Sequence, residues 1–450
     1  MGYLKRYVSV FLILAMVTIV VCFDSVSEAR KVTTTNLVPP TNIVATSITK
    51  DKIDLKWSSV TNATGYRIYG ATVSDANYTL LGTVYTTSYS HSSLQPSTDY
   101  WYYVVAFNKT IVSNGSVHVK FTTEALPVIT PPPVISPPTG KIVLGYATYY
   151  YSGDSSSYNS IVASTSILDE IVTHTYTTDG SGNLTGLIPL EQIAYAKSHN
   201  IKVMASVSNQ FSGSVAKQLL ESDINRKNLI NNILSELVKY GYSGVNIDIE
   251  GVYAANRTNM TTFMQELYGT LNPKGYLVTM AVPAKTSDSL TNSWNGAFDY
   301  KSLAMYSDQI VIMTYDEHYA GGTPGAIASY GWVKNVVDYS ITVIPKEKIL
   351  LGLAAYGYDW SASGTKSYSV SKANEVASTY GAQIMWDSVS QSPYYIYYDA
   401  QGIKHEVWFE NSYSIPFKLN MVKDYNLLGV AIWRLGLEDA AYMDKVGSGM

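Results

Sequence analysis

Three polar residues alternate with apolar ones in the segment 244–250, whose sequence is GVNIDIE. In a β-strand, alternate side chains point to opposite faces, so one face would carry Asn246, Asp248 and Glu250. Burying two carboxyl groups costs several kcal/mol unless they are hydrogen-bonded or their pKa values shift. Because neighbouring carboxyls resist double ionisation, one of them should keep a proton near neutral pH.

Glu250 ends this segment, and we expect it to be the carboxyl that keeps the proton. A protonated carboxyl that faces a cleft can serve as a general acid. Two other interpretations are a structural polar layer and a cation site built on Asp248 and Glu250. The chain has 6 histidines, scattered singly along the sequence, which argues against a transition-metal site. We expect neither a metal nor a cofactor.

The elements that must position these residues follow from an alternation of strand and helix patterns beyond Lys141. The predicted strands are 142–149, 170–176, 201–207, 244–250, 277–283, 308–315, 348–354 and 429–434. The clearest helix is 227–240, with an apolar stripe of Leu229, Ile230, Ile233, Leu234, Leu237 and Val238. This α/β pattern predicts a closed (β/α)8 TIM barrel over 141–450, with its chemistry at the carboxyl ends of the strands.

The stretch between the seventh and eighth predicted strands is too long for a single helix. It contains its own hairpin pattern, with strands at 394–398 and 403–409 around a turn at Asp399–Gly402. We therefore predict a small α+β insertion at about 361–412 on the top face of the barrel.

An all-β module is predicted ahead of the barrel, at 37–124. Ile53, Leu55 and Trp57 alternate with polar residues, so one face of their strand should be buried. Tyr100 follows Leu94 at the spacing of a tyrosine corner, and a sandwich with these features resembles a fibronectin type III domain. Its role could be that of an accessory polymer-binding module or of an inert spacer. Residues 125–140 are a proline-rich linker, which favours extended polyproline II.

The amino terminus has the pattern of a secretion signal. Lys5 and Arg6 precede an apolar run, and small residues at the spacing that signal peptidase accepts follow up to Ala29. We predict a signal peptide at 1–29 and a protein that is extracellular or in the cell wall, with a retained membrane anchor as the alternative. After cleavage no integral membrane segment is expected. The chain's only cysteine, Cys22, lies inside this segment.

Composition narrows the classes of partner. The chain of 450 residues is 46% hydrophobic and 15% charged, with a net charge of −4. This composition excludes a disordered chain, and its charge balance offers no basic surface for nucleic acid. The 39 tyrosines suit carbohydrate, because each offers a ring to stack on and a hydroxyl to hydrogen-bond. We expect a monomer.

Several segments resemble glycoside hydrolase family 18. YSGVNIDIEG, at 242–251, resembles the family signature DGxDxDxE, and MTYD, at 313–316, matches its strand-six motif. Trp433 falls at the place of the strand-eight tryptophan. The longer segments 313–333, 350–360 and 433–439 resemble the bacterial branch that includes spore cortex-lytic N-acetylglucosaminidases. This chain departs from the chitinase pattern at Ser243 and Asn246, and that asparagine is typical of the cortex-lytic branch.

The resemblance implies a retaining hydrolase of β-1,4-linked N-acetylglucosamine polymers, either peptidoglycan or chitin, that works by substrate-assisted catalysis. It assigns catalytic roles to Glu250, Asp248 and Tyr315. The residues that it implies for substrate binding are Asn246, Asp316, Tyr146, Met313 and Trp433. A catalytically silent sugar-binding protein and a purely adhesive surface protein are the alternatives from other classes.

Overall fold

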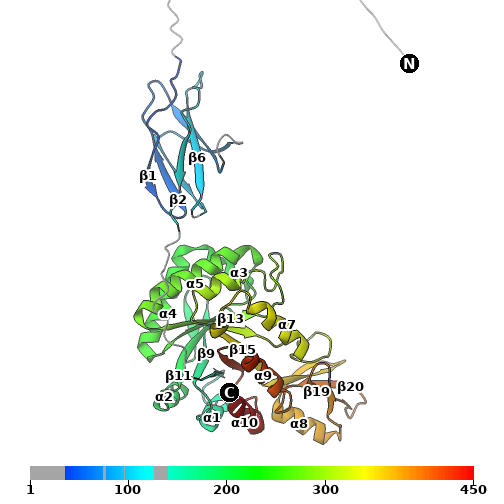
Figure 1. The fold of residues 1–450 in the computed structure, drawn as a ribbon. Coiled ribbons are helices and arrows are strands. Elements are labelled where there is room, and N and C mark those ends of the chain that lie inside the picture. The colour runs from blue at the N-terminus through cyan, green and yellow to red at the C-terminus, as the bar shows by residue number, and fades with distance from the viewer. Residues whose placement is uncertain (1–35, 74–77, 96, 126–139) are drawn as a thin grey trace, which may run out of the picture. The chain divides into compact units, whose positions relative to one another are not determined.

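The computed structural model describes residues 36–125, except 74–77 and 96, and residues 140–450. The predicted signal peptide and most of the predicted linker lie outside these residues. The chain forms two compact units, which divide between Val128 and Ile129. Both units are drawn in Figure 1.

The first unit is a β-sandwich of two antiparallel sheets, with strand orders β1-β2-β5 and β4-β3-β6-β7. The strands are β1 (Val44–Ile48), β2 (Lys52–Lys56), β3 (Gly65–Ala71), β4 (Thr79–Val84), β5 (Ser88–Ser92), β6 (Asp99–Phe107) and β7 (Val119–Thr122). Ile53, Leu55 and Trp57 are buried between the sheets, as their alternation predicts. The hydroxyl of Tyr100 accepts a hydrogen bond of 2.9 Å from the backbone N–H of Gln95, which forms the predicted corner.

The second unit contains a closed barrel of parallel strands, in which β8 pairs with both β9 and β21. Its strands are β8 (Ile142–Thr148), β9 (Glu170–Thr178), β11 (Lys202–Ser208), β12 (Gly244–Asp248), β13 (Leu277–Pro283), β14 (Gln309–Met313), β15 (Ile349–Ala354) and β21 (Gly429–Trp433). The predicted TIM barrel is confirmed. A short extra strand, β10 (Leu184–Gly186), pairs with β9 in an antiparallel hairpin that the sequence analysis did not predict.

Helices cover the outside of the barrel (Figure 1). They are α1 (Ser156–Ala163), α2 (Leu190–Ser198), α3 (Gly213–Glu221), α4 (Asp223–Tyr240), α5 (Arg257–Leu271), α6 (Tyr300–Met305), α7 (Tyr330–Ser340), α9 (Ile415–Asp424) and α10 (Ala440–Gly449). Short 3₁₀ turns lie at Ala254–Asn256, Asn272–Lys274 and Lys346–Lys348. Across the described parts of the chain, no helix combines the length and the apolar character needed to cross a membrane.

Helix α4 is longer than the predicted 227–240 because Ser222 caps its first turn, accepting a hydrogen bond from the N–H of Asn225. Gly241 ends it in the left-handed conformation, with φ +66°. Of the expected apolar stripe, Leu234 is half-buried and Val238 is 64% exposed, whereas the other members are buried. Val238 was therefore wrongly placed in the stripe: in a helix with 3.6 residues per turn it falls beyond the edge of the face that Ile230, Ile233 and Leu237 bury.

Two layers of side chains distinguish the inside of the barrel from its outside. Val245, Ile247 and Ile249 belong to the large cluster that packs the strands against the helices. A separate cluster fills the interior and includes Leu144, Tyr146, Val172, Met204, Val311 and Leu350. The even-numbered residues of β12 therefore face the interior, as the alternation predicts.

The insertion between β15 and β21 is an antiparallel sheet of order β17-β16-β20-β19-β18. Its elements are β16 (Tyr356–Ser361), β17 (Gly364–Ser369), α8 (Val370–Thr379), β18 (Met385–Asp387), β19 (Ser392–Tyr398) and β20 (Lys404–Phe409). Strand β16 already belongs to this sheet, so the insertion starts at Tyr356 rather than near 361. The reason is that β16 follows almost directly on β15 and pairs with β20.

Packing of α4 against the barrel gives a direct test of the fold. Ile233 is 1% exposed, and we expect Ile233→Ala to lower the free energy of unfolding by about 2–5 kcal/mol through lost burial and a cavity. Val238→Ala on the same helix is the matched control and should change it by less than about 0.5 kcal/mol. Urea unfolding of the full chain measures both, and equal effects would contradict the observed orientation of the helix.

Candidate active site

A cavity of about 750 Å³ lies at the carboxyl ends of the barrel strands. It brings together every residue that the sequence analysis selected except Asn246, namely Tyr146, Asp248, Glu250, Met313, Tyr315, Asp316 and Trp433. Its wall also contains residues that the sequence analysis did not select, among them Phe211, Trp294, Glu317, Tyr319 and Trp332. The cavity lies where barrels of this kind carry their chemistry.

Glu250 lies in the loop after β12, because the strand ends at Asp248 and not at 250 as expected. Beyond the end of the strand, the side chain of Asn209 makes the hydrogen bonds to the Glu250 backbone that a neighbouring strand would otherwise make. Its Oδ1 accepts from the backbone N–H of Glu250 at 2.9 Å, and its Nδ2 donates to the Glu250 carbonyl at 2.8 Å. Asn209 is itself buried, so this two-point contact fixes the backbone of Glu250 from the neighbouring strand.

The turn after Glu250 requires a glycine. Gly251 has φ +65°, and a Cβ at this position would lie 2.5 Å from the carbonyl oxygen of Phe211. Any L side chain would therefore be strained and would also collide with the adjacent loop. Gly251 lets the loop carrying Phe211 approach the loop carrying Glu250.

The two carboxyls are almost completely enclosed, with 8% of Asp248 and 9% of Glu250 exposed. Burial raises the pKa of Asp248 above its usual range. The pKa of Glu250 is raised further, first by burial and then by the negative charges of Asp248 and Asp316. The favoured state near neutral pH is thus an ionised Asp248 beside a protonated Glu250.

Asn246 lies beneath the cavity and is fully buried. Its Oδ1 accepts from the hydroxyl of Tyr146 at 3.1 Å, and its Nδ2 donates to Thr279 Oγ1 at 2.8 Å. The amide therefore links β8, β12 and β13 inside the barrel. Asn246 supports the floor under Asp248 and does not line the cavity.

Tyr315 and Asp316 follow β14 and face the cavity. Burial, then nearby charges and phenols, keep the pKa of Tyr315 well above its usual value, so its hydroxyl stays protonated and can donate. Asp316 has φ +59°, and its Oδ1 accepts from the hydroxyls of Tyr356 at 2.5 Å and Tyr358 at 3.1 Å. Both tyrosines belong to β16, so the insertion orients a residue of the barrel site.

Trp433, Tyr146 and Met313 form an apolar surface at the bottom of the cavity. The rings of Trp433 and Tyr146 meet edge to face, with centroids 5.4 Å apart. Trp433 and Met313 also pack against the cluster of the barrel interior. Such a surface offers a ring face to a flat, partly apolar ligand.

Sequence reasoning missed several residues at this site. His174 lies on the same strand face as Val172, and its Nδ1 is 3.9 Å from Asp248 Oδ2. That face could have been read from the alternation in 170–176, as for β12. Phe211 and Trp294 stack at the rim with centroids 6.5 Å apart. They come from loops after β11 and β13, and no local pattern indicates that they meet.

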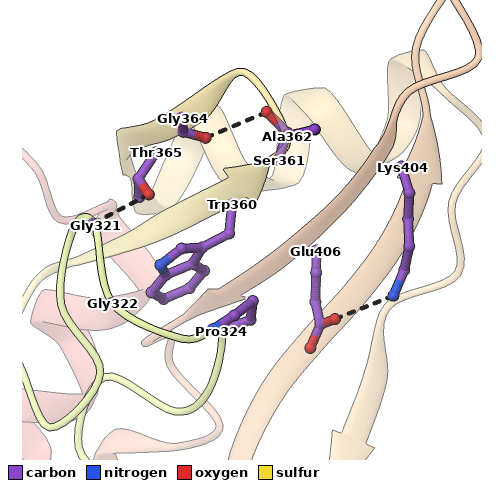
Figure 2. A pocket seen from close by; sticks show the side chains of 10 residues that line it. All are labelled: Gly321, Gly322, Pro324, Trp360, Ser361, Ala362, Gly364, Thr365, Lys404 and Glu406. Carbon is purple, nitrogen blue, oxygen red and sulfur yellow. Dashed lines mark hydrogen bonds and ion pairs between the residues drawn. The ribbon is translucent and has the colours of Figure 1, made fainter.

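A second, smaller pocket of about 370 Å³ lies where the insertion meets the loop after β14. Figure 2 shows the indole of Trp360 between that loop and Glu406. Glu406 pairs with Lys404 at 3.3 Å, and the N–H of Gly321 donates to Thr365 Oγ1 at 3.2 Å. Internal contacts thus occupy polar groups of this pocket, whereas Asp248, Glu250 and Asp316, whose pKa values are raised, line the larger cavity.

Residues 142–438 match the family of glycosyl hydrolases family 18, and residues 38–122 match the fibronectin type III domain. The first match covers more than half of the chain. The chain belongs to glycosyl hydrolase family 18. The barrel of this family 18 protein is therefore a glycoside hydrolase with a carbohydrate substrate, preceded by a fibronectin type III domain, and the resemblance seen in the sequence is confirmed.

Two proteins of Bacillus subtilis are related to this family 18 chain. The uncharacterised glycosylase YvbX is 31% identical over 314 residues, a match that covers 68% of this chain and 91% of YvbX. The cortical fragment-lytic enzyme is 34% identical over 242 residues, which cover 52% of this chain and 56% of the enzyme. The chain thus matches only about half the length of the cortical fragment-lytic enzyme.

Two solved structures resemble the family 18 chain at 69% coverage of its length. The spore cortex-lytic enzyme SleL of Bacillus cereus has a TM-score of 0.66 and 27% identity over 74% of its own chain. A chitinase from Chromobacterium violaceum has a TM-score of 0.65 and 28% identity over 99% of its chain.

The charge state of the pair can be measured directly. We expect Glu250 to titrate well above its usual pKa, and Asp248→Asn should lower that pKa because it removes the neighbouring negative charge. Carbon-13 NMR of glutamate-labelled protein, with Glu250→Gln for assignment, measures both values. Asp223→Asn, at an exposed ion pair on α4, should leave the pKa unchanged. A normal pKa for Glu250 in the wild-type protein would refute the shared-proton interpretation.

Proposed function

We propose that this protein is a secreted, retaining glycoside hydrolase that cleaves β-1,4-linked N-acetylglucosamine polymers by substrate-assisted catalysis, with peptidoglycan of the spore cortex as its substrate. The single observation that carries this proposal is the buried pair of Asp248 and Glu250 facing a cavity with the hydroxyl donor Tyr315. Secretion is supported by the signal pattern at 1–29.

The first step uses the proton that Glu250 keeps. The carboxyl protonates the glycosidic oxygen as the bond to the anomeric carbon breaks. The carbonyl oxygen of the substrate's own acetamido group attacks that carbon and forms a cyclic oxazolinium ion. No carboxylate of the protein bonds to the sugar, so this route requires a single acid and a well-held acetamido group.

Asp248 and Tyr315 would hold the acetamido group from two sides. The ionised Asp248 accepts the acetamido N–H and balances the positive charge that develops on the ring. The hydroxyl of Tyr315 donates to the acetamido oxygen and keeps it in line for attack. Both assignments agree with their ionisation, since burial and charge keep the Tyr315 hydroxyl protonated.

The apolar surface of Trp433, Tyr146 and Met313 would lie beneath the sugar ring. Stacking on an aromatic face fixes the ring while leaving its polar edges free to hydrogen-bond. In the second step Glu250, now ionised, takes a proton from water. The water oxygen attacks the anomeric carbon from the side the leaving group vacated, and the bond between that carbon and the acetamido oxygen breaks, which restores the acetamido group. The product keeps the configuration of the substrate.

Peptidoglycan is favoured among polymers by the relatives named for cortex lysis, at 34% identity for one and a TM-score of 0.66 for another. Asn246 supports the same choice, because an asparagine at this position is typical of the cortex-lytic branch. Chitin is the second candidate, since a chitinase matches over 99% of its own length. A catalytically silent sugar-binding protein is disfavoured because the acid Glu250 is present in the cavity.

Removing the acid separates catalysis from binding. We expect Glu250→Gln to lower kcat by about 10²–10⁴-fold, the usual contribution of general acid catalysis, while oligosaccharide binding stays nearly unchanged. Release of reducing ends from an N-acetylglucosamine oligomer and calorimetric titration measure the two effects. Glu375→Gln on the exposed face of α8 is the control. Full activity of Glu250→Gln would remove Glu250 from the mechanism.

The polymer is decided by parallel digestion of purified spore cortex peptidoglycan and of chitin, with Glu250→Gln as the blank. We expect faster release of reducing ends from peptidoglycan, with N-acetylglucosamine at the new ends as identified by mass spectrometry. Faster cleavage of chitin would favour the chitinase alternative. Binding without cleavage of either polymer would favour the silent sugar-binding protein.

A further inference from the structure

His174 lies beside the catalytic carboxyls but has no role in the proposed mechanism. It lies on β9 next to Thr148 of β8, and it shares the inward face of its strand with Val172. Its imidazole meets the ring of Trp433 edge to face, with centroids 5.5 Å apart. The histidine ring is thus held between the floor of the cavity and the carboxyl of Asp248.

The Nδ1 atom of His174 is buried and has no hydrogen-bond partner within the described part of the chain. A buried polar atom without a partner costs free energy, so its retention needs an explanation. The acidic group nearest to it is Asp248, whose Oδ2 lies 3.9 Å from Nδ1. That separation is longer than a hydrogen bond, so the two side chains would have to move closer for one to form.

The imidazole is neutral at this place. Burial, followed by the positive charge of Arg434, lowers the pKa of His174. A neutral imidazole carries one ring proton, and it can sit on either nitrogen. With the proton on Nδ1 the ring directs a donor at the carboxylate, whereas the other tautomer would direct a lone pair at it. The charge of Asp248 therefore selects the Nδ1 proton.

We propose that His174 is a positioning residue, which donates its Nδ1 proton to Asp248 and so keeps that carboxyl ionised and turned toward the acetamido group. This inference rests on the proposed function, because it assigns His174 a task only if Asp248 acts on the acetamido N–H. A hydrogen bond to the charged form of a carboxyl lowers its pKa and partly offsets the cost of burial.

The ionisable groups that surround Asp248 come from several elements of the barrel. Tyr146 from β8 donates its hydroxyl to Asn246, and Tyr315 after β14 is assigned to the substrate's acetamido oxygen. Asp316 is acidic, and its charge raises the pKa of Glu250. Arg434 acts on His174 itself. Among the described residues, the ring nitrogen that pairs with the Asp248 carboxyl is Nδ1 of His174, at 3.9 Å.

The consequence for pH dependence has a definite sign. If Asp248 must be ionised for catalysis, its titration sets the acidic limb of kcat. Loss of the His174 donor raises the pKa of Asp248 in the coupled pair, so the acidic limb should move to higher pH. A purely structural histidine would lower the yield or the thermal stability and leave this limb in place.

The experiment compares His174→Phe, which keeps a ring but removes both nitrogens, with His174→Gln, which keeps an N–H donor. On an N-acetylglucosamine oligomer we expect His174→Phe to lower kcat about tenfold, the size of one hydrogen bond to a charged group. Its KM should stay within about twofold, and its acidic limb should move up by about one pH unit. His174→Gln should restore most of the wild-type kcat and most of the wild-type position of the acidic limb. His199→Phe, at the exposed end of α2, is the matched control.

An acidic limb that stays at its wild-type pH in His174→Phe would overturn the inference, whatever happens to kcat. If this variant does not fold, His174→Leu gives the same comparison with a smaller side chain. Failure of the proposed function looks different, because the wild-type enzyme would then be inactive on these oligomers or Glu250→Gln would remain active.

Discussion

Asp248 and Glu250 share the mouth of a closed barrel, where the negative charge of Asp248 adds to the cost of ionising Glu250. Water would screen this repulsion, but both residues are almost completely buried. The protein therefore holds a proton on Glu250 at a pH where an exposed glutamic acid would have lost it. This stored proton is the reagent that cleavage of a glycosidic bond requires.

Several contacts serve this pair without touching a substrate. Asn209 holds the backbone of Glu250 at two points, and Asn246 links three strands below Asp248. The insertion contributes as well, since two tyrosine hydroxyls of β16 orient Asp316. The insertion is thus part of the site's support, because its tyrosines orient Asp316, whose charge raises the pKa of Glu250.

Much of the fold could be predicted because local patterns and the global fold agree. The alternation in 244–250 gave the correct faces of β12, and the eight strand patterns were enough to close the barrel. Predictions were wrong where a contact from elsewhere overrides the local pattern. Glu250 leaves the strand because Asn209 pairs with its backbone, and β16 joins the insertion because it pairs with β20.

The remaining parts of the site depend on loops that meet only in three dimensions. Phe211 and Trp294 follow different strands, and nothing in either segment indicates the other. His174 could have been found, because its strand face was readable, but the sequence does not show that Asp248 is its neighbour. The charge states are likewise only partly readable from the sequence. The residue types predict that the two carboxyls share a proton, whereas burial and neighbouring charges in the folded protein decide which carboxyl keeps it.

Neutron diffraction from a crystal grown at neutral pD tests the central claim most directly, because it locates the deuteron itself. The account predicts a deuteron on the carboxyl of Glu250 and none on Asp248. A map in which Glu250 is bare, or in which the deuteron sits on Asp248, would contradict it.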